Sequence, residues 1–113
     1  QNLSSSYEGF GSLVRSADLL KRMVHGEENL PEIFSLFESS YILVQSKSLQ
    51  PVHIPAFETI MMLRILYHLG YWSADDEYWL VQDPVTLELL DRITERVPQY
   101  MTTIRRSLNM SHL

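Results

Sequence analysis

The sequence predicts an all-α fold, a small bundle of four to five helices around one central apolar helix at about residues 55–69. Apolar residues recur at three- and four-residue steps through most of the chain, which is the period of one helix face. The segment 55–69 is apolar on nearly its whole circumference, as expected of a helix with neighbours around it. With 113 residues, 45% of them hydrophobic, the chain fits one globular domain.

The first helix is expected from about Ser5 or Ser6 to His25. Either serine could cap its start, and Gly26 suits the left-handed position after its end. The side chains expected to face the core are spaced three and four residues apart: Tyr7, Phe10, Val14, Ala17, Leu20 and Val24.

The second helix is expected to open at Asn29, which can cap it, with Pro31 in its first turn. Serine and proline residues between Ser46 and Pro55 then predict a loop. The apolar face expected for this helix comprises Leu30, Ile33, Phe34, Phe37, Tyr41, Leu43 and Val44.

The third helix, the central one, is expected from about Pro55 to Leu69, and Gly70 ends it. The segment after it is less regular, and its residues 78–81 favour a short extended piece. Asp83 is the expected cap and Pro84 the expected first residue of the next helix. A last helix from about Pro98 presents Tyr100, Met101, Ile104, Leu108 and Met110.

The charges are unevenly distributed along the chain. The formal net charge of −5 should on average repel nucleic-acid phosphate. From residue 96 onward, however, Arg96, Arg105 and Arg106 stand without any acidic side chain. This stretch is either an ordinary solvated helix face or a local basic spot for an acidic peptide or a phosphate backbone.

Motifs for catalysis or metal binding are absent from the sequence. Without cysteine there is no disulfide and no thiolate zinc site, and the acidic run 75–77 lacks the spaced oxygen ligands of a calcium loop. We therefore expect no metal, no cofactor and no enzymatic activity. No apolar run reaches the length of a membrane span and no leader is present, so we expect a cytoplasmic protein. The histidines form no paired motif: His25, His53, His68 and His112.

Three segments, in order, resemble the C-terminal helical half of the bacterial recombination mediator RecO. Residues 29–34 (Asn-Leu-Pro-Glu-Ile-Phe) resemble a helix start of that family. Residues 63–71 (Leu-Arg-Ile-Leu-Tyr-His-Leu-Gly-Tyr) resemble its Leu-Arg-Leu-Leu-x-x-Leu-Gly-Tyr run. Residues 104–113 are similar to its terminal helix, which also closes with a serine-containing stretch ending in leucine. A chain beginning with glutamine fits a fragment whose N-terminal part, an OB-fold domain in this family, is missing.

The resemblance implies a non-enzymatic interaction domain in DNA repair and recombination. Its expected partner is the acidic, apolar-ended tail of single-strand-binding protein, or another recombination mediator subunit, whereas nucleic acid would bind mainly to the missing OB-fold domain. By motif alignment, an apolar slot lies near Thr59, Leu63 and Leu66 on the central helix, with Arg105 and Arg106 as cations. The zinc module that many members carry after the Leu-Gly-Tyr motif is lacking here.

A different reading is an unrelated helical regulator that dimerises or binds a small ligand through a methionine- and aromatic-rich face. The residues that suggest this face are Met61, Met62, Tyr67 and the two tryptophans. Such a stripe is more often part of a core than a binding surface. An enzyme is the third and most distant reading.

Overall fold

The computed structural model describes residues 3–24 and 30–111, and every regular element in them is helical. This confirms the all-α class and the single central helix. The described residues form six α-helices, of which five have seven or more residues and the sixth, α4, is a single turn. The α-helices are α1 (Leu3–Met23), α2 (Pro31–Gln45), α3 (Ile54–His68), α4 (Trp79–Gln82), α5 (Leu87–Ile93) and α6 (Val97–Ser111). Two 3₁₀ turns, η1 (Pro51–His53) and η2 (Thr94–Arg96), precede α3 and α6.

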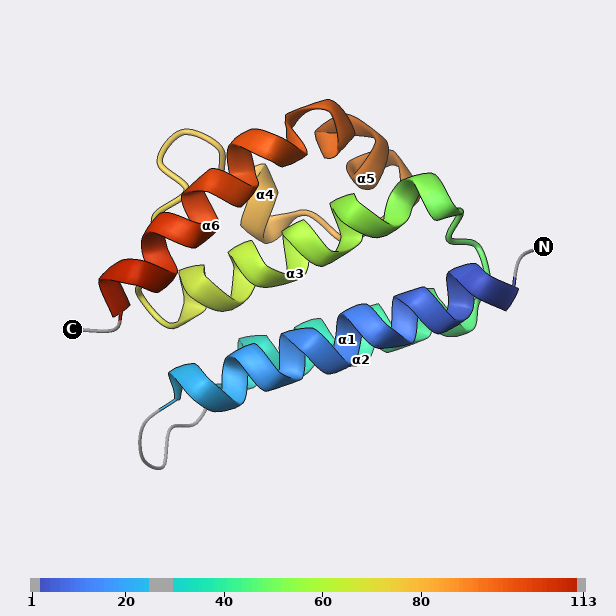
Figure 1. Cartoon of the computed structure of the whole chain (residues 1–113), viewed down its shortest axis with the longest axis horizontal. Helices are drawn as coiled ribbons and strands as arrows, with labels where there is room; N and C mark the ends of the chain where they lie inside the picture. The colour runs from blue at the N-terminus through green and yellow to red at the C-terminus, as the bar shows by residue number, and fades with distance from the viewer. Residues whose placement is uncertain (1–2, 25–29, 112–113) are drawn as a thin grey trace.

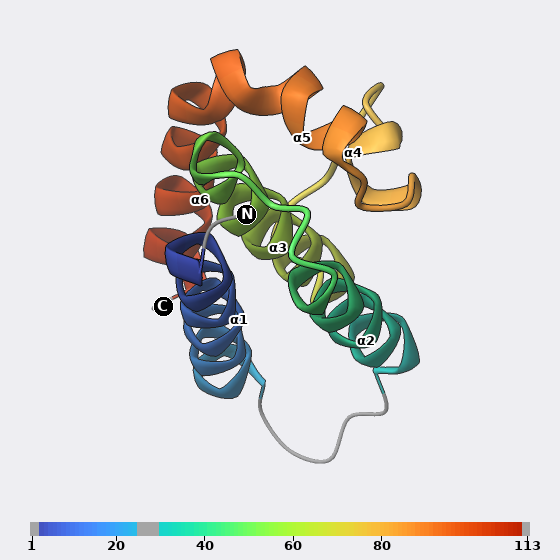
Figure 2. The same cartoon turned by 90° about the vertical axis from the view of Figure 1, so that its right-hand side faces the viewer.

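Helix α3 lies in the middle of the bundle (Figures 1 and 2). The antiparallel hairpin of α1 and α2 lies along one side of it, and α4, α5 and α6 cover the other side. Helices α1 and α6 run in the same direction as α3, whereas α2 runs against it (Figure 1). Because α3 has neighbours around it, its fully buried side chains come from almost every face: Ala56, Phe57, Ile60, Met61, Leu63, Ile65 and Leu66.

The Leu-Gly-Tyr run ends α3 in the way that the sequence predicts. Gly70 has a φ of 84°, the left-handed conformation that glycine adopts without strain. The Tyr71 amide donates back to the Leu66 carbonyl at 2.8 Å, and the Gly70 amide donates to the Tyr67 carbonyl at 3.0 Å. This pair of bonds satisfies carbonyls that the helix end would otherwise leave free.

The apolar face predicted for α1 was wrong. The buried side of this helix is Gly9, Ser12, Leu13, Ser16, Leu19 and Met23, whereas Tyr7 is 78% and Val14 60% exposed. Small residues allow the close approach: a Cβ on Gly9 would lie 3.1 Å from both methyl groups of Val44 on α2. The more hydrophobic side of α1, which includes Tyr7 and Val14, is therefore not the side that packs against the bundle. The helix start expected at Ser5 or Ser6 was wrong, because α1 already begins at Leu3. The stop expected at Gly26 lies outside the described residues.

The apolar face predicted for α2 was correct only in part. Ile33 and Val44 are buried as expected, but so are Leu36 and Ser40, which were not in the predicted set. Phe34 is 72% exposed, and Tyr41 is exposed as well. The helix begins at Pro31 as predicted, and the proposed cap Asn29 lies outside the described residues.

Two predictions between α3 and α5 were wrong. Residues 78–81 are not extended but largely helical, because an isolated strand would leave its backbone groups unpaired and the described residues offer no strand beside it. Asp83 does not cap α5. It precedes a proline, adopts extended backbone angles, and its carbonyl accepts a hydrogen bond from Arg64. The cap is Thr86, whose hydroxyl accepts from the Leu89 amide at 3.2 Å.

Candidate functional site

The structure places the slot residues predicted from the sequence in the core. Leu63 and Leu66 are fully buried, and Thr59 is 1% exposed. The Thr59 hydroxyl donates to the Pro55 carbonyl at 2.7 Å, so its proton is directed mainly to the backbone of α3. The two leucines therefore offer no surface to a partner in this conformation.

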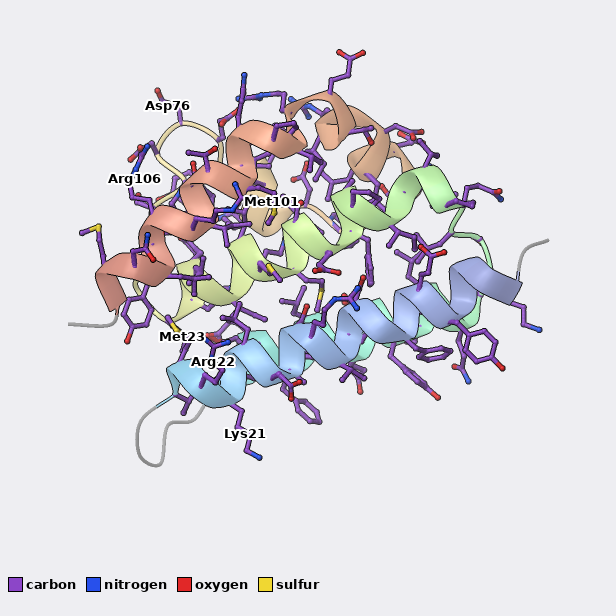
Figure 3. The ribbon with its side chains drawn as sticks, viewed as in Figure 1. Lys21, Arg22, Met23, Asp76, Met101 and Arg106 are labelled. Atoms are coloured by element: carbon purple, nitrogen blue, oxygen red, sulfur yellow. The ribbon has the colours of Figure 1, made fainter. Side chains whose placement is uncertain are left out.

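A hollow does open beside Thr59, between the first halves of α3 and α6. It encloses about 290 Å³ and has a largely apolar lining of Ile54, Pro55, Glu58, Thr59, Val97 and Met101. Figure 3 shows Met101 between α6 and α3. The Met101 sulfur accepts a long hydrogen bond from the Thr59 hydroxyl, at 3.6 Å. The hollow is thus close to one predicted residue, Thr59, whereas the predicted Leu63 and Leu66 lie one and two helical turns further along α3.

The single acid of this lining, Glu58, is held by α1. Arg15 donates from Nε at 2.9 Å and from Nη2 at 2.5 Å to the same Glu58 oxygen, and the Ser12 hydroxyl donates to it at 2.9 Å. The hydrogen bond to Glu58 is the main reason why the pKa of Arg15 is raised. The negative charge of the Glu58 carboxylate, which lines the hollow, is therefore largely balanced by Arg15.

Further arginines lie on α1 and α6, the two helices that flank α3 on one side (Figure 2). We use the word groove for the strip of surface over α3 between these two helices. Arg22 follows Arg15 by seven residues, which places it on the same side of α1, and Figure 3 shows it toward α6 while Lys21 points outward. Arg105 is exposed and follows Val97 and Met101 at four-residue steps, so it continues the stripe that lines the hollow. Arg106 points away from α3, toward the loop of Asp76. The structure thus separates the two predicted cations: Arg105 lies by the groove and Arg106 does not.

A second and larger cavity lies on the other side of α3. It encloses about 500 Å³ between the start of α2, the end of α3 and the segment before α5. Its polar residues include Arg64, which is only 7% exposed, and His68 one turn further along. Arg64 donates from Nε to the Leu80 carbonyl at 2.8 Å and from Nη2 to the Asp83 carbonyl. These bonds give Arg64 a structural role, because they tie α3 to the segment that follows it.

Burial shapes the ionisation of both residues. Removal from water lowers the pKa of the Arg64 guanidinium to about 10, against the smaller opposing effect of Asp83. Burial likewise lowers the pKa of His68, with Glu32 acting in the opposite direction. At neutral pH the cavity therefore contains one buried cation and a neutral imidazole.

The exposed stripe of α1 joins that of α2 in an apolar face, which we name the hairpin face (Tyr7, Phe10, Val14, Phe34 and Tyr41). The Phe10 and Tyr41 rings pack with their centroids 5.8 Å apart at one end. A hollow of about 280 Å³ lies at the other end, lined by Ala17, Leu20, Leu30, Ile33, Phe34 and Phe37. Sequence reasoning placed these side chains in the core. The signal that could have corrected it is the row of small residues Gly9, Ser12 and Ser16 at helical spacing.

Residues 3–24 and 30–111 contain neither a candidate metal site nor a candidate membrane span. No three histidine, aspartate or glutamate side chains there come close enough together to hold a metal ion. None of the helices in that part of the chain is both long and apolar enough to cross a membrane.

Comparison with known proteins adds no relative. No family model, no curated protein and no solved structure matches the chain.

Proposed function

We propose that this chain is a non-enzymatic helical interaction domain of a RecO-like recombination mediator, acting in the cytoplasm in DNA repair. Three motifs in the family's order support the proposal: the Pro31 helix start, the Leu-Gly-Tyr end of α3 and the terminal helix. The helical architecture around α3 is compatible with it. The proposed partner is the acidic, apolar-ended tail of single-strand-binding protein or another recombination protein.

The hollow beside Thr59 is the observation that carries the proposal. An acidic tail with an apolar end needs a slot for its last side chain and cations for its carboxylates. The hollow offers about 290 Å³ of mostly apolar lining, enough for one large side chain. Arg15, Arg22 and Arg105 border the same groove, and Glu58 is already paired with Arg15. The Arg15–Glu58 pair has no net charge, so Arg22 and Arg105 supply the local positive charge, although the chain as a whole is negative.

The expected affinity is weak and depends on salt. Each arginine of the groove has an exposed head group, and exposed ion pairs contribute about 1 kcal/mol or less. Salt at about 0.1 M screens such charges over roughly 10 Å. Insertion of the terminal apolar side chain supplies the part of the binding energy that salt does not weaken.

Arg105 and Arg106 provide a matched pair for the test. A fluorescein-labelled peptide of several aspartates ending in phenylalanine is titrated by anisotropy at low and moderate salt. Arg105→Glu should weaken binding at least tenfold, because it reverses a charge at the groove. Arg106→Glu makes the same charge change outside the groove and should have a much smaller effect. No binding by the wild type at millimolar peptide, or equal losses in the two variants, would remove the proposed site.

The hairpin face favours a second candidate function, dimerisation. Its aromatic pair and its hollow lie at opposite ends of one face, so a two-fold axis across α1 and α2 would place the pair of each copy at the hollow of the other. The five exposed side chains offer on the order of 500 Å² per copy, which reaches the low end for a specific interface. Light scattering over a concentration series tests this candidate, with Phe34→Glu expected to keep the chain monomeric. A monomer at every concentration would exclude it.

A further inference from the structure

The cavity around Arg64 has three walls that come from separate parts of the chain. Helix α2 contributes its first turns, α3 contributes Arg64 and His68, and the segment 81–85 closes the third side. Its volume of about 500 Å³ lies within the range of small-molecule sites. Arg64 and His68 follow Thr59 by five and nine residues, so they lie on the far side of α3 from the hollow beside Thr59. The cavity is thus separate from the proposed peptide groove.

Arg64 brings a positive charge into this cavity, and none of the ion pairs of the described residues ties it to a carboxylate, although the Asp83 side chain lies near enough to raise the pKa of Arg64. Both of its hydrogen bonds go to main-chain carbonyls, of Leu80 and Asp83. The ion pairs found among the described residues involve other arginines and His53, not Arg64. A guanidinium has five N–H donors, and two of them are used. Buried charges in proteins are normally paired, so this cation is suited to an anion from outside the chain.

Helix α2 adds a second source of positive potential. Its first residue is Pro31, and the preceding Leu30 provides no side-chain cap. The amides of the first turn have no partner within the helix, and they carry the positive end of its dipole. Pro31, Glu32 and Ser35 of these turns line the same cavity as Arg64. His68 can donate one further N–H in its neutral form.

The acids at the rim limit the charge of the ligand. Glu32 and Asp83 both line the cavity and both are exposed. Both acids repel any anion, but they repel a dianion such as a phosphate monoester about twice as strongly as a monocarboxylate. A single carboxylate also matches the bidentate geometry of one guanidinium. Apolar wall residues remain for the body of the ligand: Leu36, Val81, Pro84 and Val85. We infer that the Arg64 cavity binds a small monocarboxylate with an apolar body.

Phenylacetate is a suitable probe, and phenylacetamide is its neutral control of the same shape. In a ¹⁵N NMR titration, phenylacetate should shift the Ser35 amide and the Arg64 side-chain signals. Phenylacetamide and the dianion phenyl phosphate should both bind at least tenfold more weakly. Equal binding of phenylacetamide would overturn the role of Arg64, and tighter binding of phenyl phosphate would overturn the assigned charge. Absence of shifts at about 10 mM phenylacetate would overturn the site itself, since this concentration exceeds a millimolar dissociation constant by about tenfold.

A variant that fills the cavity tests the site without replacing Arg64, because loss of the Arg64 side chain could unfold the domain. Ser35 is exposed at the cavity wall, so Ser35→Trp should fill the cavity and abolish binding. Gln45→Trp, on an exposed position of the same helix away from the cavity, should bind as the wild type does. Unchanged binding by Ser35→Trp would overturn the inference. The acidic peptide described above should leave the Ser35 amide unshifted, which separates the two sites experimentally.

Discussion

At the scale of single residues, burial in this chain is decided by packing partners more than by hydrophobicity. Leu63 is fully buried, whereas the equally apolar Val14 and Phe34 are largely exposed. Arg64 is buried in the central helix because its donors meet two main-chain carbonyls, of Leu80 in α4 and of Asp83 just after it. The sequence predicted the burial of Leu63 from the all-round apolar pattern of its helix, but it gave no sign of the carbonyls that surround Arg64.

Leu63→Ala should destabilise the domain by about 2–5 kcal/mol, because it removes a fully buried side chain and leaves a cavity. Leu66→Ala should behave in the same way. Val14→Ala is the control, since its exposed position predicts a change of about 0.5 kcal/mol or less. Urea unfolding followed by circular dichroism measures all three. A change at Leu63 as small as that at Val14 would mean that α3 is not the centre of the bundle.

The pH dependence of stability should include a contribution from His68. Burial lowers its pKa in the folded state below the usual 6.5, so the unfolded chain binds the proton more readily. The contribution is therefore fully present above about pH 6.5 and is lost as the pH falls toward the folded pKa. His68→Gln should lose less stability than the wild type between pH 7 and pH 5.5. Parallel curves for the two proteins, measured by thermal unfolding, would show that His68 is not responsible.

At the scale of elements, the helices that carry strong periodicity or clear stop signals could be predicted. Gly70 ends α3 as expected, and Pro31 begins α2 as expected. The helix start predicted at Asp83 was wrong because the pattern of an acid followed by proline fits a helix start and an extended turn equally well. Which one forms depends on Arg64, which is distant in sequence. For α1, the close contact of Gly9 with α2 selects the buried face over the more apolar one.

The two glycines of α1 should respond oppositely to substitution. A side chain at Gly9 would meet both Val44 methyl groups at 3.1 Å and Leu49 at 3.4 Å, so Gly9→Val should cost about 1–3 kcal/mol by overpacking. Gly11 meets only the flexible end of Arg15, at 3.3 Å, so Gly11→Ala should stabilise the helix by about 0.5–1 kcal/mol. Urea unfolding compares the two. An unchanged free energy of unfolding for Gly9→Val would argue against the packing of Gly9 on α2.

At the scale of the whole molecule, the bundle distributes its features over three separate surfaces. The groove between α1 and α6 is basic, the cavity between α2 and α3 contains one buried cation, and the hairpin face is apolar. The sequence predicted the all-α class and the need for an apolar slot beside cations, because helical periodicity and charge runs are local signals. It did not locate the hollow. The hollow is formed by residues about 40 positions apart, and only the packing of α6 alongside α3 brings them together.

The most direct test of the proposed function is a ¹⁵N NMR titration of the unlabelled acidic peptide into the domain at low salt. Binding in the groove should shift the amides of Thr59, Met101 and Arg105, and the shifts should diminish as salt rises. The amides of the hairpin face and that of Ser35 should remain unchanged. Shifts confined to the hairpin face, or none at millimolar peptide, would contradict the assignment of the groove as the partner site.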